Sequence, residues 1–194
     1  MERELYEVMD WAAVEEIVYS ESADPHAILG PHKTDKGILV QAFFPGRDRV
    51  LLQRGKTKMP MELADESGFF ACLIPGEKES LRYQFILPEA DGSETVAEDP
   101  YRFMPELPEV ELRKFKAGES TAAHTFLGAH EKKMGGVSGI RFAVFAPNAM
   151  RVSVVGDFNN WDGRVHELRR MGDSGVFALF VPGVEAGALY KYEI

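Results

Sequence analysis

A chain of 194 residues, 45% of them hydrophobic and 27% charged, is long enough for one large domain or two domains of roughly 90–100 residues. Its net charge of −9 argues against a nucleic acid or an anionic membrane as partner, because both favour a basic surface. No apolar run approaches the ~18–20 residues that span a bilayer, and the charged N-terminus lacks the apolar core of a signal peptide. We therefore expect a cytoplasmic protein. Cys72, in an apolar run, is expected to be a buried hydrophobe.

Residues 1–22 are predicted to form an N-terminal helix. Apolar residues such as Leu5, Met9 and Ile17 recur at helical spacing, which indicates an amphipathic helix. The helix is expected to end before Pro25, because the residue that precedes a proline disfavours the helical conformation.

After this helix the chain contains two copies of one unit. Four blocks recur in the same order, and the offset between the copies grows only between blocks, where loops accept insertions. The matching blocks are HAILGPH (26–32) with HTFLGAH (124–130), ILVQAFFPGRDRVLL (38–52) with IRFAVFAPNAMRVSV (140–154), GFFACLIPG (68–76) with GVFALFVPG (175–183), and LRYQFIL (81–87) with ALYKYEI (188–194).

Each copy is β in character. Its short runs are rich in β-branched and aromatic residues, are bounded by Gly and Pro, and in places alternate between apolar and polar residues. The pattern predicts an all-β protein with two tandem immunoglobulin-like β-sandwiches, preceded by the short N-terminal helix.

The predicted boundaries follow from composition. The first sandwich takes residues 23–103 and the second takes residues 122–194. Residues 104–121, which are rich in proline and charge, are expected to be a linker with one helical turn after Pro108. The second copy stops on a strand, so we expect it to be incomplete at its C-terminal end.

The stretch VVGDFNNWDG (154–163) places Trp161 in a polar turn after a strand. A loop tryptophan either folds back onto its own domain or is presented to a ligand or a neighbouring domain. An exposed indole matches the apolar face of a glucose unit, and Asn159 and Asn160 could bind its hydroxyl groups. The residues alone leave these alternatives open.

Other chemistry is not expected. Asp157 and Asp162 lie on one solvated turn, which does not raise a carboxyl pKa as a glycosidase acid requires, so turn formation explains them better. No Cys or Glu-x-x-His motif completes a zinc site around the repeated histidines, so no metal site and no cofactor is predicted. Those histidines are His26, His32, His124 and His130.

The second copy resembles a known family. GIRFAVFAPNAMRVSVVGDFNNWDG (139–163), followed by VPG and YKYE, is similar to the family-48 carbohydrate-binding module that precedes the catalytic barrel of 1,4-α-glucan (glycogen) branching enzymes. DPHAILGPHKTDKGILVQAFFPG, GFFACLIPG and EDPYRF in the first copy resemble the extra N-terminal sandwich of long-form bacterial branching enzymes.

The resemblance implies a site. Glycogen-binding relatives use the tryptophan of this loop as a sugar platform and a lysine of the Tyr-Lys strand to bind hydroxyl groups, which correspond to Trp161 and Lys191. Further site residues of the family correspond to positions after Ile194. The family commonly has Trp at the positions of Phe145 and Phe177, a difference expected to repack a strand and to leave the loop unchanged. A tryptophan here could instead anchor the module to the catalytic barrel.

The resemblance also implies a function. The chain would be the N-terminal arm of a branching enzyme, with α-glucan (glycogen or maltooligosaccharides) and the C-terminal catalytic barrel of the same polypeptide as partners. The retaining transfer of an α-1,4-glucan segment to an α-1,6 branch would occur in that barrel, so the 194-residue chain alone is expected to be inactive. Alternatives are a stand-alone glycogen-binding or regulatory module, the arm of a debranching, isoamylase-type relative, and a structural spacer that binds no sugar.

Overall fold

The N-terminal amphipathic segment folds as two short helices, where the sequence predicts one. Helix α1 spans Glu2–Val8 and helix α2 spans Trp11–Val18. Asp10 separates them: its backbone is extended, and its carboxylate accepts a hydrogen bond from the Ala13 N–H at 3.3 Å, which makes it the N-cap of α2. The apolar side chains of this segment are buried as the periodicity predicts: Leu5, Met9, Val14 and Ile17.

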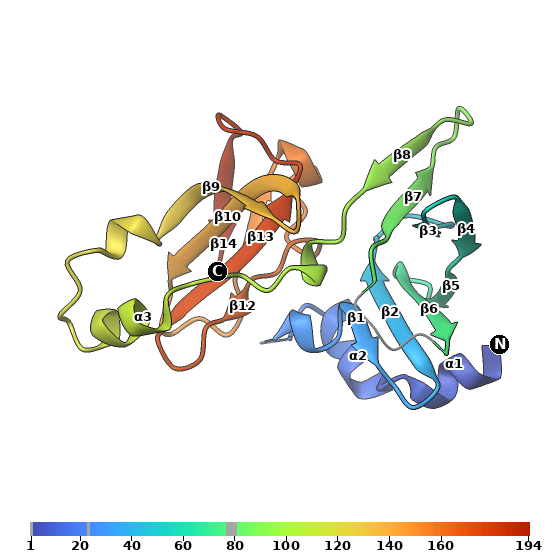
Figure 1. The fold of residues 1–194 in the computed structure, drawn as a ribbon, viewed down its shortest axis with the longest axis horizontal. Helices are drawn as coiled ribbons and strands as arrows, with labels where there is room; N and C mark the ends of the chain where they lie inside the picture. The colour runs from blue at the N-terminus through green and yellow to red at the C-terminus, as the bar shows by residue number, and fades with distance from the viewer. Residues whose placement is uncertain (1, 23, 77–80) are drawn as a thin grey trace. The chain divides into compact units, whose positions relative to one another are not determined.

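The structure is a computed structural model that describes residues 2–22, 24–76 and 81–194 (Figure 1). It divides into two units, of which the first comprises Met1–Ser20 and Ala27–Arg102, and the second comprises Glu21–His26 and Phe103–Ile194. No helix within the described ranges is long and apolar enough to cross a membrane.

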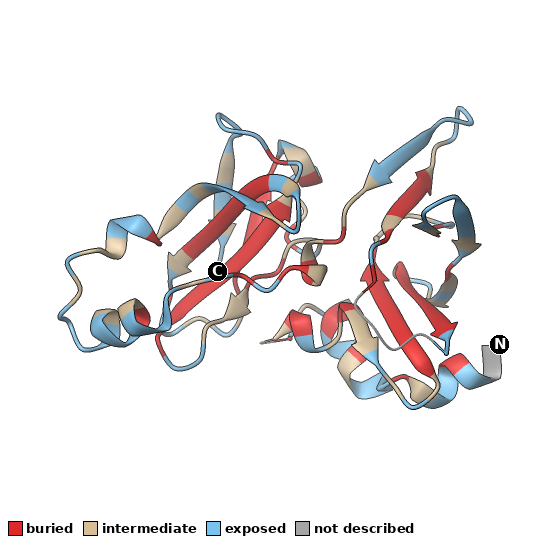
Figure 2. Cartoon of the chain, in the orientation of Figure 1, coloured by how far each residue is buried: buried red, intermediate tan, exposed pale blue. Residues whose placement is uncertain are grey.

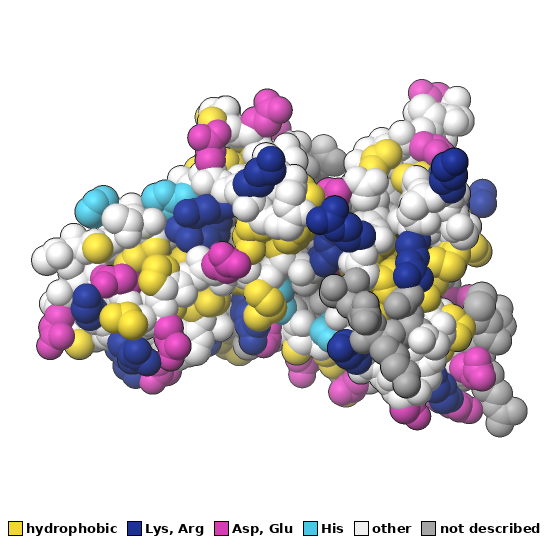
Figure 3. All heavy atoms as spheres, viewed as in Figure 1, with side chains coloured by type: hydrophobic (Ala, Val, Ile, Leu, Met, Phe, Trp, Pro, Cys, Tyr) yellow, Lys and Arg dark blue, Asp and Glu magenta, His cyan; other side chains and the backbone are white. Residues whose placement is uncertain are grey.

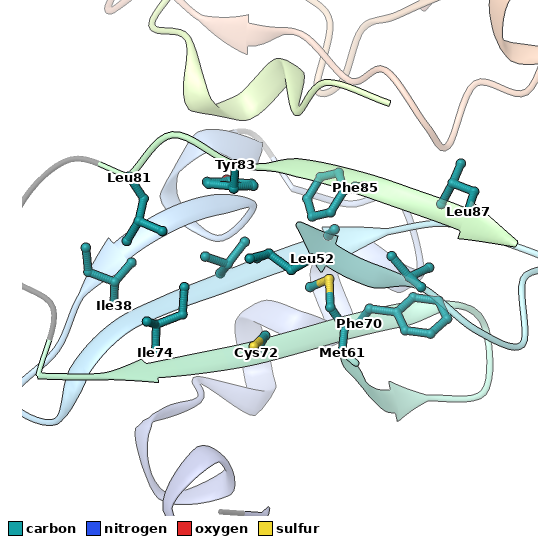
Figure 4. Close-up of a cluster of buried hydrophobic side chains, with 13 residues drawn as sticks. Ile38, Leu52, Met61, Phe70, Cys72, Ile74, Leu81, Tyr83, Phe85 and Leu87 are labelled. Carbon is teal, nitrogen blue, oxygen red and sulfur yellow. The ribbon is translucent and has the colours of Figure 1, made fainter. Parts of the chain in front are cut away.

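The first unit is a sandwich of two antiparallel four-stranded sheets. One sheet has the order β1 (Gly30–Lys33), β2 (Gly37–Phe43), β6 (Phe69–Pro75) and β5 (Glu62–Asp65). The other has the order β4 (Thr57–Pro60), β3 (Leu51–Arg54), β7 (Gln84–Pro88) and β8 (Glu94–Ala97). Side chains from both sheets, such as Leu52, Phe70 and Phe85, meet in one core (Figure 4). Cys72 is buried in this core, as expected.

The second unit repeats the plan with fewer strands. One antiparallel sheet has the order β12 (Arg169–Arg170), β13 (Val176–Pro182), β10 (Val137–Phe145) and β9 (Gly128–Met134). The other contains β11 (Ser153–Gly156) and β14 (Tyr190–Glu193). In Figure 2 the buried residues concentrate on β2 and β6 of the first unit and on β10 and β13 of the second. The predicted pair of immunoglobulin-like sandwiches is confirmed.

Helix α3 (Glu109–Lys116) lies in the segment predicted as a linker and is longer than the single turn expected after Pro108. Leu112 is buried in a cluster with Phe126 and with side chains of β10 and β13. One face of the β10–β13 sheet is therefore covered by α3.

The internal repeat of the sequence is also a repeat of backbone contacts. Gly37 near the start of β2 and Gly139 near the start of β10 hold equivalent positions in the pairs β2–β6 and β10–β13. A Cβ added at Gly37 would lie 2.1 Å from the carbonyl oxygen of Ile74. A Cβ added at Gly139 would lie 2.4 Å from the carbonyl oxygen of Val181. The two sheets thus share one requirement for a residue without a side chain.

We expect Gly139→Ala to lower the free energy of unfolding of the second unit by about 2–4 kcal/mol, because the Val181 carbonyl must move away from the new methyl group. Urea unfolding followed by circular dichroism measures this. Gly172→Ala is the control: its Cβ meets nothing within 4 Å, and its φ of +59° limits the cost to about 1 kcal/mol of backbone strain. Equal losses in the two variants would contradict the steric explanation.

Candidate functional site

Trp161 is held outside its own sandwich. It lies in the loop of residues 157–165 that follows β11, and its side chain is 42% exposed. Asn160 and Trp161 have φ values of +54° and +59°, the left-handed region that bulky residues rarely adopt. Each such residue costs about 1–2 kcal/mol, so the rest of the loop must hold the tryptophan in this conformation.

The Asn159 side chain provides the main support. It is only 7% exposed, its Oδ1 accepts a hydrogen bond from the Gly156 N–H at 2.9 Å, and its Nδ2 donates to the Val154 carbonyl at 2.9 Å. Nδ2 also lies 3.0 Å from Nδ1 of His166. The amide that the sequence assigns to a sugar is therefore used inside the loop, and Asn159 shapes the site without facing solvent.

His166 completes this support as a neutral ring. Burial lowers its pKa to about 4, so the ring is neutral at neutral pH. Because the Asn159 Nδ2 is a donor, Nδ1 accepts this hydrogen bond in the tautomer that carries its proton on Nε2. Protonation of Nδ1 would place two donors opposite each other. The anchor is therefore sensitive to acid.

Arg151 closes the other end of the loop. Its guanidinium donates to the Gly163 carbonyl at 3.1 Å and to the Glu193 carboxylate at 2.6 Å, and it also lies 3.4 Å from the carboxylate of buried Glu167. A Cβ at Gly163 would lie 2.5 Å from the Glu193 carboxylate, so a larger residue there would have to displace this side chain. Sequence reasoning missed Arg151.

Two of the predicted site residues meet at the exposed indole. The Lys191 Nζ lies 6.0 Å from the centroid of the Trp161 ring, in cation–π range. Lys191 reaches the ring from β14, where it pairs with Val155 of β11. The Trp161 Nε1–H donates to the Asp157 Oδ1 at 2.8 Å and so fixes the plane of the ring, while Asn160 is exposed beside it.

This arrangement suits recognition and not catalysis. An apolar ring with an ammonium over it and a carboxylate at its edge matches a pyranose, which has an apolar C–H face and equatorial hydroxyl groups. The Arg164 side chain donates to Asp162 and holds the pKa of that carboxyl below its usual range. A general acid needs the opposite shift.

The second histidine of each repeat makes a local backbone contact, whereas the His26 Nε2 lies 3.2 Å from the distant Phe103 carbonyl oxygen. The His32 Nε2 lies 3.1 Å from the Leu29 carbonyl oxygen, and the His130 Nε2 lies 2.9 Å from that of Leu127. The pattern His-x-x-Leu-Gly-x-His thus encodes the same turn twice. Across the described part of the chain, no group of three or more His, Cys, Asp or Glu side chains could hold a metal ion.

We expect Asn159→Ala to lower the free energy of unfolding of the second unit by about 2–3 kcal/mol, because the substitution leaves buried backbone groups of the loop without partners. Asn160→Gly is the matched control, since glycine adopts φ +54° freely and the exposed side chain is dispensable, so its effect should stay within about 0.5 kcal/mol. Urea unfolding compares the two. A similar loss in both would exclude the anchoring role of Asn159.

The second unit should lose stability as the pH falls from about 6.5 to about 4. In this window the unfolded chain protonates His166 while the folded chain does not, so the loss should reach about 3 kcal/mol. Unfolding is measured across this window in the wild type and in His166→Gln, whose curve should be flatter. Burial raises the pKa of Asp99 in the first unit to about 6, so Asp99 makes the fold more stable as the pH falls. This contribution is the same in the wild type and in His166→Gln. Parallel curves would contradict the prediction.

Three solved structures are similar to the chain at low identity. A putative alpha amylase from Salmonella typhimurium is 23% identical over 37% of the chain, with a TM-score of 0.32. Pullulanase type I from Bacillus subtilis str. 168 is 17% identical over 84% of the chain, with a TM-score of 0.29, and pullulanase from Anoxybacillus sp. LM18-11 is 15% identical over 84%, also with a TM-score of 0.29. The chain spans 12%, 22% and 23% of the length of these three proteins, respectively.

Two family models match the chain and agree with the resemblances read from its residues. Residues 10–101 match the N-terminal domain of the alpha-1,4-glucan branching enzyme GlgB. Residues 126–194 match carbohydrate-binding module 48, also described as the isoamylase N-terminal domain, and this range includes both Trp161 and Lys191. The chain therefore matches a GlgB-type N-terminal domain over residues 10–101 and a family-48 carbohydrate-binding module over residues 126–194, the combination that corresponds to the N-terminal region of a branching enzyme.

Proposed function

We propose that the chain binds α-glucan through the face formed by Trp161 and Lys191. The observation that carries this proposal is the exposed indole, held in a strained backbone conformation with the Lys191 ammonium over its ring. Strain maintained by a buried network is typical of functional sites, and the second unit belongs to a carbohydrate-binding family.

The geometry supports a specific mode of binding. The C–H face of a glucose unit stacks on Trp161, and the Lys191 ammonium donates to the hydroxyl groups at the edge of the ring. The indole N–H donates to one oxygen of the Asp157 carboxylate. The remaining acceptor sites of that carboxylate are available to the hydroxyl groups of the sugar. Asn160 is the adjacent exposed amide. Because the ring is fixed before the sugar arrives, little conformational entropy is lost on binding.

The parent enzyme proposed here is a 1,4-alpha-glucan branching enzyme of cytoplasmic glycogen biosynthesis, which transfers an α-1,4-glucan segment to an α-1,6 branch with retention. The match to the GlgB N-terminal domain supports this parent. Its chemistry is assigned to a (β/α)₈ barrel, which needs ~250 residues and so exceeds this chain. The two sandwiches would raise the local concentration of glucan near that barrel without a cofactor, and alone they would be inactive.

A second candidate function is supported by the same exposure. A tryptophan that is 42% exposed could instead anchor the module on the catalytic barrel, since buried interface centres favour tryptophan. In that case its removal would weaken the docking of the two domains and leave sugar binding unchanged.

Affinity electrophoresis in glycogen separates the two candidates. We expect the wild type to be retarded, Trp161→Ala to lose most of the retardation, and Lys191→Gln to lose a smaller part of it. The stacking contact is expected to contribute more binding energy than a single hydrogen bond from an exposed lysine. Trp11→Ala is the matched control, because Trp11 is 39% exposed but lies in the first unit. Equal retardation of wild type and Trp161→Ala would reject the platform and favour the anchor.

A further inference from the structure

A groove runs beside α3 in the second unit, away from the Trp161 loop. Two adjoining hollows of about 400 Å³ each lie between α3 and the turn that joins β12 to β13. Each volume is within the ~300–1,000 Å³ of small-molecule sites. Both hollows are lined by Lys116, Arg170, Asp173 and Ser174, and neither includes a residue of the 157–165 loop.

The floor of the groove is apolar and contains an exposed ring. Phe145, the last residue of β10, is 48% exposed and packs edge-on against Phe115 of α3, with the ring centroids 5.1 Å apart. A Cβ at Gly175 would lie 2.8 Å from the Phe145 ring, so the ring keeps this position only beside glycine. In the other hollow Leu107, Leu112 and Met171 provide the apolar surface.

The rim is polar, and its basic side chains are engaged within the protein. Arg170, which lines both hollows, donates to the Ala149 carbonyl and lies over the Phe177 ring. Lys116 at the end of α3 pairs with Asp173 of the turn, so this ion pair connects the two walls. The Arg113 guanidinium pairs with the Glu109 carboxylate at 3.0 Å, and the Arg169 guanidinium lies 3.2 Å from the Asp24 carboxylate. Figure 3 shows basic, acidic and hydrophobic side chains intermixed over α3. Each basic side chain that lines the hollows thus has a partner within the protein, so the rim offers donors and acceptors without a free cation to select an anion.

We propose that this groove is a second site for a neutral α-glucan chain, separate from the Trp161 face. The inference rests on the proposed function, because it assigns the same class of ligand to a second surface. The exposed Phe145 ring stacks on the C–H face of one glucose unit, while the rim groups bind the hydroxyl groups of that unit and its neighbours. Two adjoining hollows suit a linear oligosaccharide better than a single sugar.

The test is a titration of the ¹⁵N-labelled 194-residue chain with maltoheptaose, followed by amide chemical shifts. We expect two sets of shifted amides in the wild type, one in residues 156–165 and 190–193 and the other in residues 113–118 and 171–176. Phe145→Ala should weaken the second set about 5- to 10-fold and leave the first unchanged. Trp161→Ala should weaken the first set and leave the second unchanged.

A second variant, which leaves the packing of the sheet unchanged, tests the groove even if Phe145→Ala does not fold. Asp173→Ala removes a carboxylate whose side chain is 86% exposed, so the fold should persist while affinity in the second set falls about 2- to 5-fold. Shifts confined to the Trp161 set would overturn the groove and leave the proposed function intact. Shifts confined to the groove would support it and reject the Trp161 platform, and their complete absence would reject both.

Discussion

The Asn159 carboxamide is the interaction on which the site depends. Two consecutive non-glycine residues in left-handed conformations are unfavourable, and a short polar loop has no apolar core of its own to impose them. The buried amide binds backbone groups at the end of β11 and the ring of His166, and so connects the loop to the sandwich. The indole of Trp161 is held outside the sandwich because the side chain of Asn159, two residues earlier, is buried.

The architecture could be predicted from sequence because it depends on local and repeated signals. Alternating strands bounded by Gly and Pro, present twice in the same order, indicate two sandwiches before any contact is known. The break between α1 and α2 was missed, because the apolar spacing continues across Asp10 while the single cap that divides the helix makes no periodic signal. A periodic pattern identifies the buried face and does not locate each helix end.

The site could be predicted only in part, for a different reason. Trp161 and Lys191 were found through a motif, and the structure brings them together. The orientation of Asn159 could not be predicted, because four polar residues surround the tryptophan and nothing local distinguishes the one that turns inward. Arg151 was missed because its partners become neighbours only when β11 pairs with β14. Long-range contacts of this kind have no short sequence signature.

The two units show how one fold can support unequal roles. In the second unit β11 leads into the long loop, whereas in the first the equivalent strand β3 turns directly into β4. The glycines that allow close packing of the central strands are present in both. The shared backbone thus sets the fold, and the longer loop after β11 distinguishes the unit that contains Trp161.

The bond between the indole N–H and Asp157 has a consequence for what the loop can distinguish. Because its only hydrogen-bond donor is occupied, the ring offers a flat apolar surface and no hydrogen bond that would fix the orientation of a ligand. Every interior glucose of an α-glucan presents the same face, so under the proposed function a long polymer would be held at many equivalent positions along its length. The number of those positions multiplies the chance of capture, and a chain can move from one to the next without first escaping into solution.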